Sequence, residues 1–176
     1  MSLKISKLHN IPASGIYSDI TSLISTFKCS RNPDSEMFLQ KTAMRHESKD
    51  ISRTYICVDT EKSKIIGYFT LAIKCINVGV LKDIDPKTFE SMNADGGVSQ
   101  AYLIGQLARA DDSPKGLGRT MFDIAMAILF SMNETIGCHT VRVDCTDELV
   151  GYYTGYGFVT VGKNAKNNLN SMVLII

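Results

Sequence analysis

Short hydrophobic segments alternate with polar ones along this chain, and their spacing predicts both strands and helices. Residues 54–59 and 65–73 are rich in β-branched and aromatic side chains, and the polar residues 61–64 between them are typical of a turn. These segments therefore predict a β-hairpin. Residues 34–49 place apolar side chains among polar ones after an Asn-Pro-Asp start, which predicts an amphipathic helix with an acidic first turn.

The second half of the chain predicts a strand, a loop, a helix and a further strand. Residues 101–110 are apolar, and residues 111–118 are rich in breakers. Apolar side chains then recur at helical spacing as far as Asn133, at Phe122, Ala125, Met126, Leu129 and Met132. Residues 139–145 alternate as a strand, with Val141 and Val143 expected inside. A strand-helix-strand unit of this kind predicts two parallel strands joined by a right-handed crossover.

The remaining segments complete one predicted domain over residues 1–176. Residues 83–97 contain Pro86 and end in Asp-Gly-Gly, which predicts an irregular loop with one helical turn. A short helix is expected from Asp147, a strand near 158–161 and a final strand over 172–176. The chain has no internal repeat and no linker-like stretch, and its length of 176 residues suits one hydrophobic core.

Composition and charge narrow the class of protein. Hydrophobic residues make up 44% of the chain and charged residues 21%, as in ordinary globular proteins. The formal net charge of +1 gives no general indication of a polyanionic partner. The apolar runs are too short to cross a bilayer, and the N-terminus lacks the apolar core of a signal peptide. We therefore expect a cytoplasmic protein without a membrane partner.

The cysteines and histidines predict neither disulfides nor a metal site. Five cysteines are an odd number and include no Cys-x-x-Cys pair, so we expect them to be reduced. The three histidines lie far apart and lack ligand spacing with cysteines or carboxylates, so no metal is expected.

A glycine-containing turn at the start of the long helix predicts an anion-binding site. Gly116 and Gly118 lie where the first amides of the helix have no intrahelical acceptor, and the helix dipole adds positive potential there. Lys115 and Arg119 flank the turn with charge suited to a pyrophosphate. Two glycines alone often make only a tight turn, but this pair follows a predicted strand and opens a predicted helix. The motif is neither a Walker loop nor a Rossmann fingerprint, because its glycine spacing differs from both.

Three stretches, taken in order, extend this interpretation to an enzyme family. They are Leu107-Ala108 at the end of a strand, Lys115-Gly116-Leu117-Gly118-Arg119 at the helix start, and Tyr152-Tyr153-Thr154-Gly155-Tyr156-Gly157-Phe158. Together they resemble the GNAT N-acetyltransferases, which carry an R/Q-x-x-G-x-G/A turn and a later Tyr-x-x-x-Gly-Phe segment. The resemblance runs from about Phe27 to the C-terminus. It implies an α/β (α+β) fold with a mixed central sheet, in which a pair of parallel strands splays apart between flanking helices.

Within that superfamily the chain is most similar to the acetyltransferase toxins of type II toxin-antitoxin modules. The shared stretches are Phe27-Lys28-Cys29, the amphipathic helix, Ser52-Arg53-Thr54-Tyr55, Ile66-Gly67-Tyr68-Phe69-Thr70-Leu71-Ala72 and Ile104-Gly105-Gln106-Leu107-Ala108. Two positions depart from the pattern, because Ser113 stands where the family has Arg or Gln and Pro114 replaces a Gly. Pro114 has no N–H, so the turn offers one donor fewer to a phosphate and the affinity for acetyl-CoA is expected to be reduced.

The resemblance implies acetyl-CoA as co-substrate and a set of residues that hold it. The pantetheine arm is expected to hydrogen-bond along the strand end, and the pyrophosphate to lie in the turn. The implied coenzyme-binding residues are Leu107, Ala108, Arg109, Lys115, Gly116, Leu117, Gly118, Arg119 and Thr120. An amine would then attack the thioester directly, without an acyl-enzyme.

Tyr153 is the predicted proton donor to the departing thiolate, because it begins the Tyr-x-x-x-Gly-Phe segment. Tyr152 and Tyr156 lie nearby, and a role in packing is the alternative for all three. No carboxylate is singled out as general base, and Asp147 is expected to cap a helix instead. Cys145 has no paired histidine and is expected to pack within a strand.

Three functions remain open at this point. The first is a toxin-type enzyme that acetylates the α-amine of an aminoacyl-tRNA, the second an acetyltransferase for a small molecule or a protein amine, and the third a catalytically weakened binding module. The first predicts an RNA-binding face formed from Lys28, Arg31, Lys41, Arg45, Lys49 and Arg53, with Lys115 and Arg119 nearer the coenzyme. A mixed-charge, solvated helix explains the same residues. A repressor-like antitoxin and a homodimer through residues 78–81 or 172–176 are further candidate partners.

Overall fold

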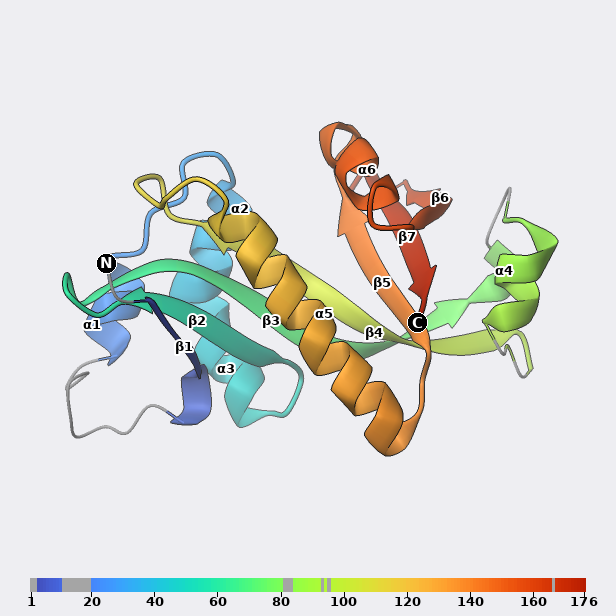
Figure 1. The fold of residues 1–176 in the computed structure, drawn as a ribbon, viewed down its shortest axis with the longest axis horizontal. Helices are drawn as coiled ribbons and strands as arrows, with labels where there is room; N and C mark the ends of the chain where they lie inside the picture. Colours follow the sequence, from blue (N-terminus) through green and yellow to red (C-terminus); the bar gives the residue numbers. More distant parts are fainter. Residues whose placement is uncertain (1–2, 11–19, 81–83, 93, 95, 166) are drawn as a thin grey trace. The chain divides into compact units, whose positions relative to one another are not determined.

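The computed structural model describes residues 3–10, 20–80, 84–92, 94, 96–165 and 167–176. Its strands form one seven-stranded sheet in the order β1-β2-β3-β4-β5-β7-β6 (Figure 1). The strands are β1 Leu3–Lys7, β2 Arg53–Asp59, β3 Lys64–Asn77, β4 Val98–Arg109, β5 Thr140–Cys145, β6 Val159–Asn164 and β7 Leu169–Ile175. β4 and β5 pair in parallel, whereas β1–β2, β2–β3, β5–β7 and β6–β7 are antiparallel. The predicted mixed sheet and hairpin are confirmed.

The structure contains the helices that the sequence predicted, and α1 in addition. They are α1 Ile20–Ser25, α2 Pro33–Met37, a π-helical segment η2 Phe38–Thr42, α3 Ala43–Ser48, α4 Pro86–Ser91, α5 Leu117–Ile136 and α6 Asp147–Thr154, with short 3-10 turns η1 Leu8–Asn10 and η3 Val78–Val80. The helix predicted over 34–49 is thus present, with a π segment between α2 and α3. The Asn32 side chain accepts a hydrogen bond from the Ser35 amide, and Pro33 begins the helix.

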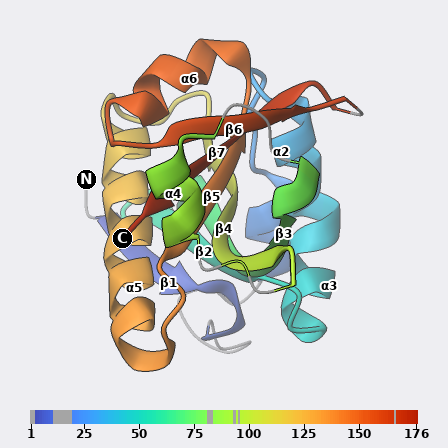
Figure 2. The ribbon, with the colours of Figure 1, turned by 90° about the vertical axis from the view of Figure 1, so that its right-hand side faces the viewer.

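The chain divides into two compact units. Unit 1 consists of Met1–Ala72 with Gln106–Met126, and unit 2 of Ile73–Gly105 with Ala127–Ile176. In unit 1, α2 and α3 cover one face of β2 and β3 and the first part of α5 covers the other (Figures 1 and 2). Neighbouring residues of β3 show this arrangement. The Tyr68 hydroxyl donates to the Ser35 carbonyl of α2, and Gly67 faces Met121 of α5.

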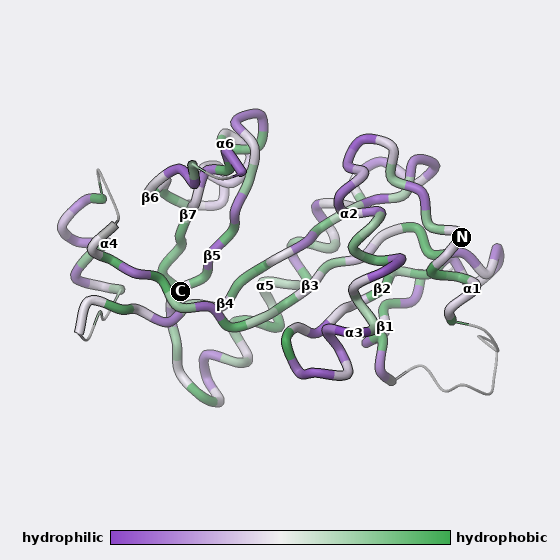
Figure 3. Tube along the Cα trace, turned by 180° about the vertical axis from the view of Figure 1, so that it is seen from behind, coloured by the Kyte–Doolittle hydropathy of each residue, from purple (hydrophilic) through white to green (hydrophobic). Residues whose placement is uncertain are grey.

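The core of unit 1 is built on aromatic side chains. Phe27 and Tyr68 are both fully buried and meet edge to face, with ring centroids 5.5 Å apart. Phe38 stacks on Tyr68 at 6.3 Å. Such pairs stabilise a core beyond their buried area. Figure 3 colours the chain by hydropathy and shows hydrophobic stretches on β3 and β4 and hydrophilic loops near α2.

One cluster of buried side chains in unit 2 is mainly aliphatic and consists of Ile76, Val78, Met92, Ala101, Val161 and Val173. Burial within one core, the alternative to subunit pairing for these segments, holds for Val78, Met172 and Val173, which are buried. Residues 174–176 are half-buried. Residue 81 lies outside the described residues, and the homodimer stays a prediction.

The cysteines form no disulfide, and each histidine has a hydrogen-bond partner. All five cysteines are free thiols. Each histidine ring forms a hydrogen bond with one neighbour: His9 with Glu47, His46 with Ser52 and His139 with the Ser91 carbonyl. The described residues contain no cluster of three or more His, Cys, Asp or Glu suited to a metal ion. No helix in the same part of the chain is long and apolar enough to span a membrane.

Candidate functional site

The loop between β4 and α5 is held in place by its backbone. The Ala110 amide donates to the Ile66 carbonyl of β3 at 2.9 Å, and the Asp111 amide donates to the Lys28 carbonyl at 3.0 Å. The Ser113 amide closes a turn onto the Ala110 carbonyl at 3.1 Å. The loop that precedes the glycines therefore has a fixed path within unit 1.

The two carboxylates of this loop point to partners outside it. Asp111 accepts hydrogen bonds from the amide and the hydroxyl of Ser30, at 2.9 and 2.7 Å. Asp112 accepts from the Lys64 ammonium at 2.6 Å. These hydrogen bonds lower the pKa of both carboxyl groups below the ordinary range. Both acids are consequently ionised near neutral pH and directed to Ser30 and Lys64.

The start of α5 presents backbone donors without acceptors. Gly116 has a φ of +86°, a conformation that favours glycine. The Leu117 amide donates to the Pro114 carbonyl at a long 3.4 Å, and the Leu117 side chain is buried. The amides of Gly118 and Arg119 have no acceptor within the part of the chain that the structure describes. Free amides at the first turn of a 20-residue helix form an anion-binding surface.

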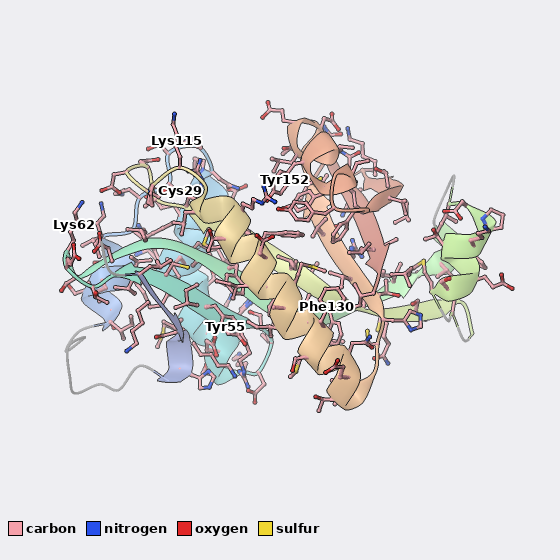
Figure 4. All side chains as sticks on the ribbon, viewed as in Figure 1. Cys29, Tyr55, Lys62, Lys115, Phe130 and Tyr152 are labelled. Atoms are coloured by element: carbon pink, nitrogen blue, oxygen red, sulfur yellow. The ribbon has the colours of Figure 1, made fainter. Side chains whose placement is uncertain are left out.

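The polar side chains around this turn differ in how far they are engaged. The amide and the hydroxyl of Thr120 both donate to the Gly116 carbonyl, at 3.1 and 3.4 Å, so Thr120 is used within the helix. The Lys115 side chain extends away from the loop into solvent (Figure 4). Arg119 is also exposed, and its Nε lies 3.9 Å from Asp123 Oδ2. These two cations therefore flank the turn from the solvent side.

The end of β4 offers one free edge of backbone groups. The Gln106 amide donates to Thr70 Oγ1 at 2.9 Å, and the Ala110 amide donates to a β3 carbonyl, so even-numbered residues turn their amides toward β3. Alternation along a strand places the amides of Leu107 and Arg109 on the opposite edge. The parallel pairing of β4 with β5 ends at Ile104 and Val143, before this segment. In the part of the chain that the structure describes, the Leu107 and Arg109 amides therefore lie beyond the segment of β4 that pairs with β5.

The side chains of the same strand end alternate between the core and the turn. Ala108 is buried in the core of unit 1. Arg109 is half-buried, and its Nη1 lies 3.5 Å from Ser113 Oγ. A Cβ placed on Gly118 would lie 3.3 Å from Arg109 Cδ. The Arg109 side chain therefore runs past the first turn of α5, a feature that no sequence motif indicated.

Tyr153 lies in unit 2 on α6 and is 8% exposed. Its ring contacts Tyr152 at 5.2 Å and Phe158 at 5.8 Å between centroids. Burial raises the pKa of the Tyr153 phenol to about 12. Tyr152 is 39% exposed, and its hydroxyl lies 3.4 Å from that of Tyr156. Of the three tyrosines, Tyr153 is the buried one.

The predicted helix cap at Asp147 is wrong. The N-cap of α6 is Thr146, whose extended backbone precedes the helix, and Asp147 is the first helical residue. Its carboxylate instead accepts hydrogen bonds from the Lys163 ammonium at 2.8 Å and from the Asn170 side-chain amide at 2.6 Å. These bonds lower the pKa of Asp147. The Asp147 side chain, which the sequence predicted to cap the helix, therefore binds residues of β6 and β7 instead.

The other groups near α6 are structural. Asp144 accepts from the Arg142 guanidinium and the Ser171 hydroxyl, at 3.0 and 2.8 Å. The Cys145 sulfur is buried 3.6 Å from the Met172 sulfur, and burial raises the pKa of the thiol. Cys145 therefore packs within a strand, as predicted, and lacks the acidity of a nucleophilic cysteine.

Unit 2 also contains two cavities that the sequence did not indicate. One, of about 470 Å³, is lined by Cys75, Met92, Val98, Gln100, Ile136, Cys138, His139 and Thr140. The other, of about 210 Å³, is lined by Ile76, Asn77, Arg142, Val161, Gly162, Lys163, Asn164 and Ser171. Their linings come from separate segments of the chain, so no local pattern could mark them.

Comparisons with known proteins identify the fold. No protein-family model and no curated protein matches the chain. Many solved structures match it, and three that cover nearly all of the chain are the following. AtaT complexed with acetyl-methionyl-tRNAfMet has a TM-score of 0.75 and 21% identity, covering 99% of this chain and 95% of that one. A tyrosine-to-phenylalanine mutant of the AtaT toxin, bound to acetyl-CoA and the C-terminus of the antitoxin AtaR, has a TM-score of 0.69 and 19% identity over 99% and 94%. A tyrosine-to-phenylalanine mutant of KacT has a TM-score of 0.77 and 18% identity over 99% and 95%. The chain therefore has the GNAT fold of these toxins.

Proposed function

We propose that this protein is an N-acetyltransferase that uses acetyl-CoA and transfers the acetyl group directly to a primary amine. The observation that carries the proposal is the start of α5. There the amides of Gly118 and Arg119, which follow the left-handed Gly116, have no acceptor among the described residues. An acetyl-CoA complex of the similarly folded AtaT supports it.

The coenzyme is held by main-chain groups of unit 1. Its pyrophosphate accepts hydrogen bonds from the amides at the start of α5, with the helix dipole and the flanking Lys115 and Arg119 adding positive potential. The pantetheine arm pairs with the Leu107 and Arg109 amides at the free edge of β4, as an added strand would. Pro114 cannot donate, so this turn binds with fewer hydrogen bonds than a glycine at that position would allow.

The reaction needs one bond to form and one to break. The neutral amine attacks the thioester carbonyl, the N–C bond forms, and collapse of the tetrahedral intermediate breaks the C–S bond. Tyr153 donates its phenolic proton to the departing CoA thiolate, and the amine loses its proton to water, from which Tyr153 is reprotonated. The acidity of Tyr153 supports this role, because a phenol with a pKa of about 12 remains protonated at neutral pH.

The favoured acceptor is the α-amine of an aminoacyl-tRNA, and the AtaT complex with acetyl-methionyl-tRNAfMet supports that choice. The basic residues expected to contact RNA are not equivalent. Lys28 pairs with Glu36, and Arg53 pairs with Asp50 and Glu47. The remaining cations of this region form no ion pair with a described residue, and we assign the RNA contacts to them: Arg31, Lys41, Arg45 and Lys49.

Partners and location follow the same proposal. The AtaT complex with AtaR supports a small antitoxin as partner of this chain. A single functional domain over 1–176, a homodimer and a cytoplasmic location stay predictions.

Radioactive acetyl-CoA tests the activity directly. Incubation with charged tRNA should label the aminoacyl ester, and the label should be released by mild alkali together with the amino acid. Labelling of polyamines or peptides instead would assign the enzyme a different amine. Calorimetry that detects no acetyl-CoA binding would contradict the enzymatic function and favour a binding module.

A further inference from the structure

Arg109 is a half-buried cation without a carboxylate partner among the described residues. Its one described polar contact is the Ser113 hydroxyl, at 3.5 Å from Nη1. Two acids follow it closely in the sequence, yet Asp111 is bonded to Ser30 and Asp112 to Lys64. Its charge is therefore left uncompensated by the loop that surrounds it.

The other half-buried arginines of the protein are paired. Arg53 Nη2 lies 2.5 Å from an Asp50 oxygen, and Arg142 Nη2 lies 2.9 Å from Asp144. Partial burial of a guanidinium normally needs such a partner, because the charge loses hydration. Arg109 also lies beside the N-terminus of α5, where the helix dipole disfavours a cation. The lack of a carboxylate partner and the position beside the helix N-terminus would both be offset by an anion bound next to the Arg109 guanidinium.

The geometry points to the anion that the turn itself binds. Arg109 Cδ would lie 3.3 Å from a Cβ on Gly118, and the guanidinium reaches Ser113. The side chain thus lies along the same first turn whose Gly118 and Arg119 amides lack acceptors. Ser113 is the position where GNAT enzymes carry Arg or Gln.

We propose that the Arg109 guanidinium supplies the side-chain N–H donors for the coenzyme's diphosphate that the Arg or Gln of the motif position would supply and Ser113 cannot. The inference rests on the proposed use of acetyl-CoA. A planar guanidinium can donate two parallel hydrogen bonds to phosphate oxygens, and Ser113 orients it. Gly118 then has a second function, because the absence of its side chain leaves room for the aliphatic part of Arg109.

The experiment compares ligands that differ in phosphate. Binding of CoA and of the uncharged fragment pantetheine is measured by calorimetry for the wild type, Arg109→Met, Arg109→Lys and Lys62→Met. The last variant removes an exposed cation of the same unit and is the charge-matched control. Loss of hydrogen bonds to a charged group predicts CoA binding about 10- to 100-fold weaker in Arg109→Met, with a smaller loss in Arg109→Lys. Pantetheine binding should not change in any variant.

Thermal stability separates ligand binding from a structural role. Arg109→Met should unfold at the same or a higher temperature than the wild type without ligand, because it removes an uncompensated cation. It should lose most of the stabilisation that CoA gives the wild type. An Arg109→Met protein that is destabilised without ligand and binds CoA and pantetheine equally poorly would show a structural role and overturn the proposal.

Two further outcomes are decisive. A wild type that binds no CoA contradicts the proposed function itself. A wild type that binds CoA, with Arg109→Met binding it equally well, overturns the role of Arg109 alone. Gly118→Ala tests the packing step: it should weaken CoA binding more in the wild type than in Arg109→Ala, where the contact with the Arg109 side chain is absent. An equal loss in both backgrounds would show that Gly118 does not act through Arg109.

Discussion

The turn of unit 1 and the tyrosine cluster of unit 2, formed by Tyr152, Tyr153 and Tyr156, differ in the groups that they present. The turn presents main-chain donors at an exposed helix start, where Gly116 and Gly118 contribute by lacking side chains. The cluster withdraws a side-chain hydroxyl from water, and burial changes the acidity of Tyr153. In the proposed function, binding of the diphosphate thus depends on backbone geometry, whereas proton transfer depends on the packing around the Tyr153 phenol. Mutations at the two regions should therefore affect different quantities.

The largest expected effect separates chemistry from binding. Tyr153→Phe removes the proton donor and keeps the ring, so the acetyl transfer rate should fall by about 10²- to 10⁴-fold. The dissociation constant for acetyl-CoA should stay within about twofold, because the turn in unit 1 is untouched. Single-turnover kinetics and calorimetry measure the two quantities. Tyr152→Phe is the control, and an equal loss of rate in that variant would remove Tyr153 from its assigned role.

A second substitution tests the packing that supports the turn. A Cβ on Gly67 would lie 2.8 Å from Met121 Sδ and 3.1 Å from the Ala108 carbonyl oxygen. Gly67→Ala should therefore lower the free energy of unfolding by about 1–3 kcal/mol, as overpacking of a core does. Denaturant titration gives the value. Gly162→Ala provides the comparison, because nothing lies within 4 Å of its Cβ position; a similar loss there would mean that contact with Met121 is not the cause.

The third substitution distinguishes backbone strain from coenzyme binding. Gly116→Ala forces a side chain into a φ of +86° and should cost about 1–2 kcal/mol of stability. Gly137→Ala does the same at a φ of +78°, away from the turn, and neither added Cβ meets an atom within 4 Å. Both variants should lose similar stability, but only Gly116→Ala should bind acetyl-CoA more weakly. Equal affinities in the two variants would argue against the turn as the coenzyme site.

The pH dependence of the rate should give the smallest effect, and it identifies the acceptor. Tyr153 donates only while protonated, and its pKa is raised to about 12, so its ionisation should cause no loss of rate as pH rises to about 10. The rate should increase with pH as the acceptor amine loses its proton. For an α-amine with a pKa of about 7.7–8.0 it should level off above about pH 8.5, whereas for a lysine-like amine near 10.4 it should keep rising. A falling rate between pH 8 and 10 would contradict the tyrosine assignment.

Local sequence predicted the elements whose hydrophobic pattern is unambiguous. The hairpin of β2 and β3, and the unit of β4, α5 and β5, agree with the predictions because alternation and helical spacing are strong there. β1 and α1 were not predicted. β1 is a short, largely exposed strand, and pairing with β2 rather than its own composition makes it a strand. β3 also runs on to Asn77 through the exposed residues 73–75, beyond the apolar run that predicted it.

For the candidate site, the sequence by itself determined the turn, since a left-handed Gly116 and a helix start after a strand are local properties of a few residues. Tertiary structure decided the rest. Packing buries Tyr153 and leaves Tyr152 exposed. Asp147 pairs with Lys163 and does not cap the helix, and the Arg109 side chain lies beside Gly118. Burial, charge pairing and close packing depend on residues distant in the chain, and a local pattern carries no information about them.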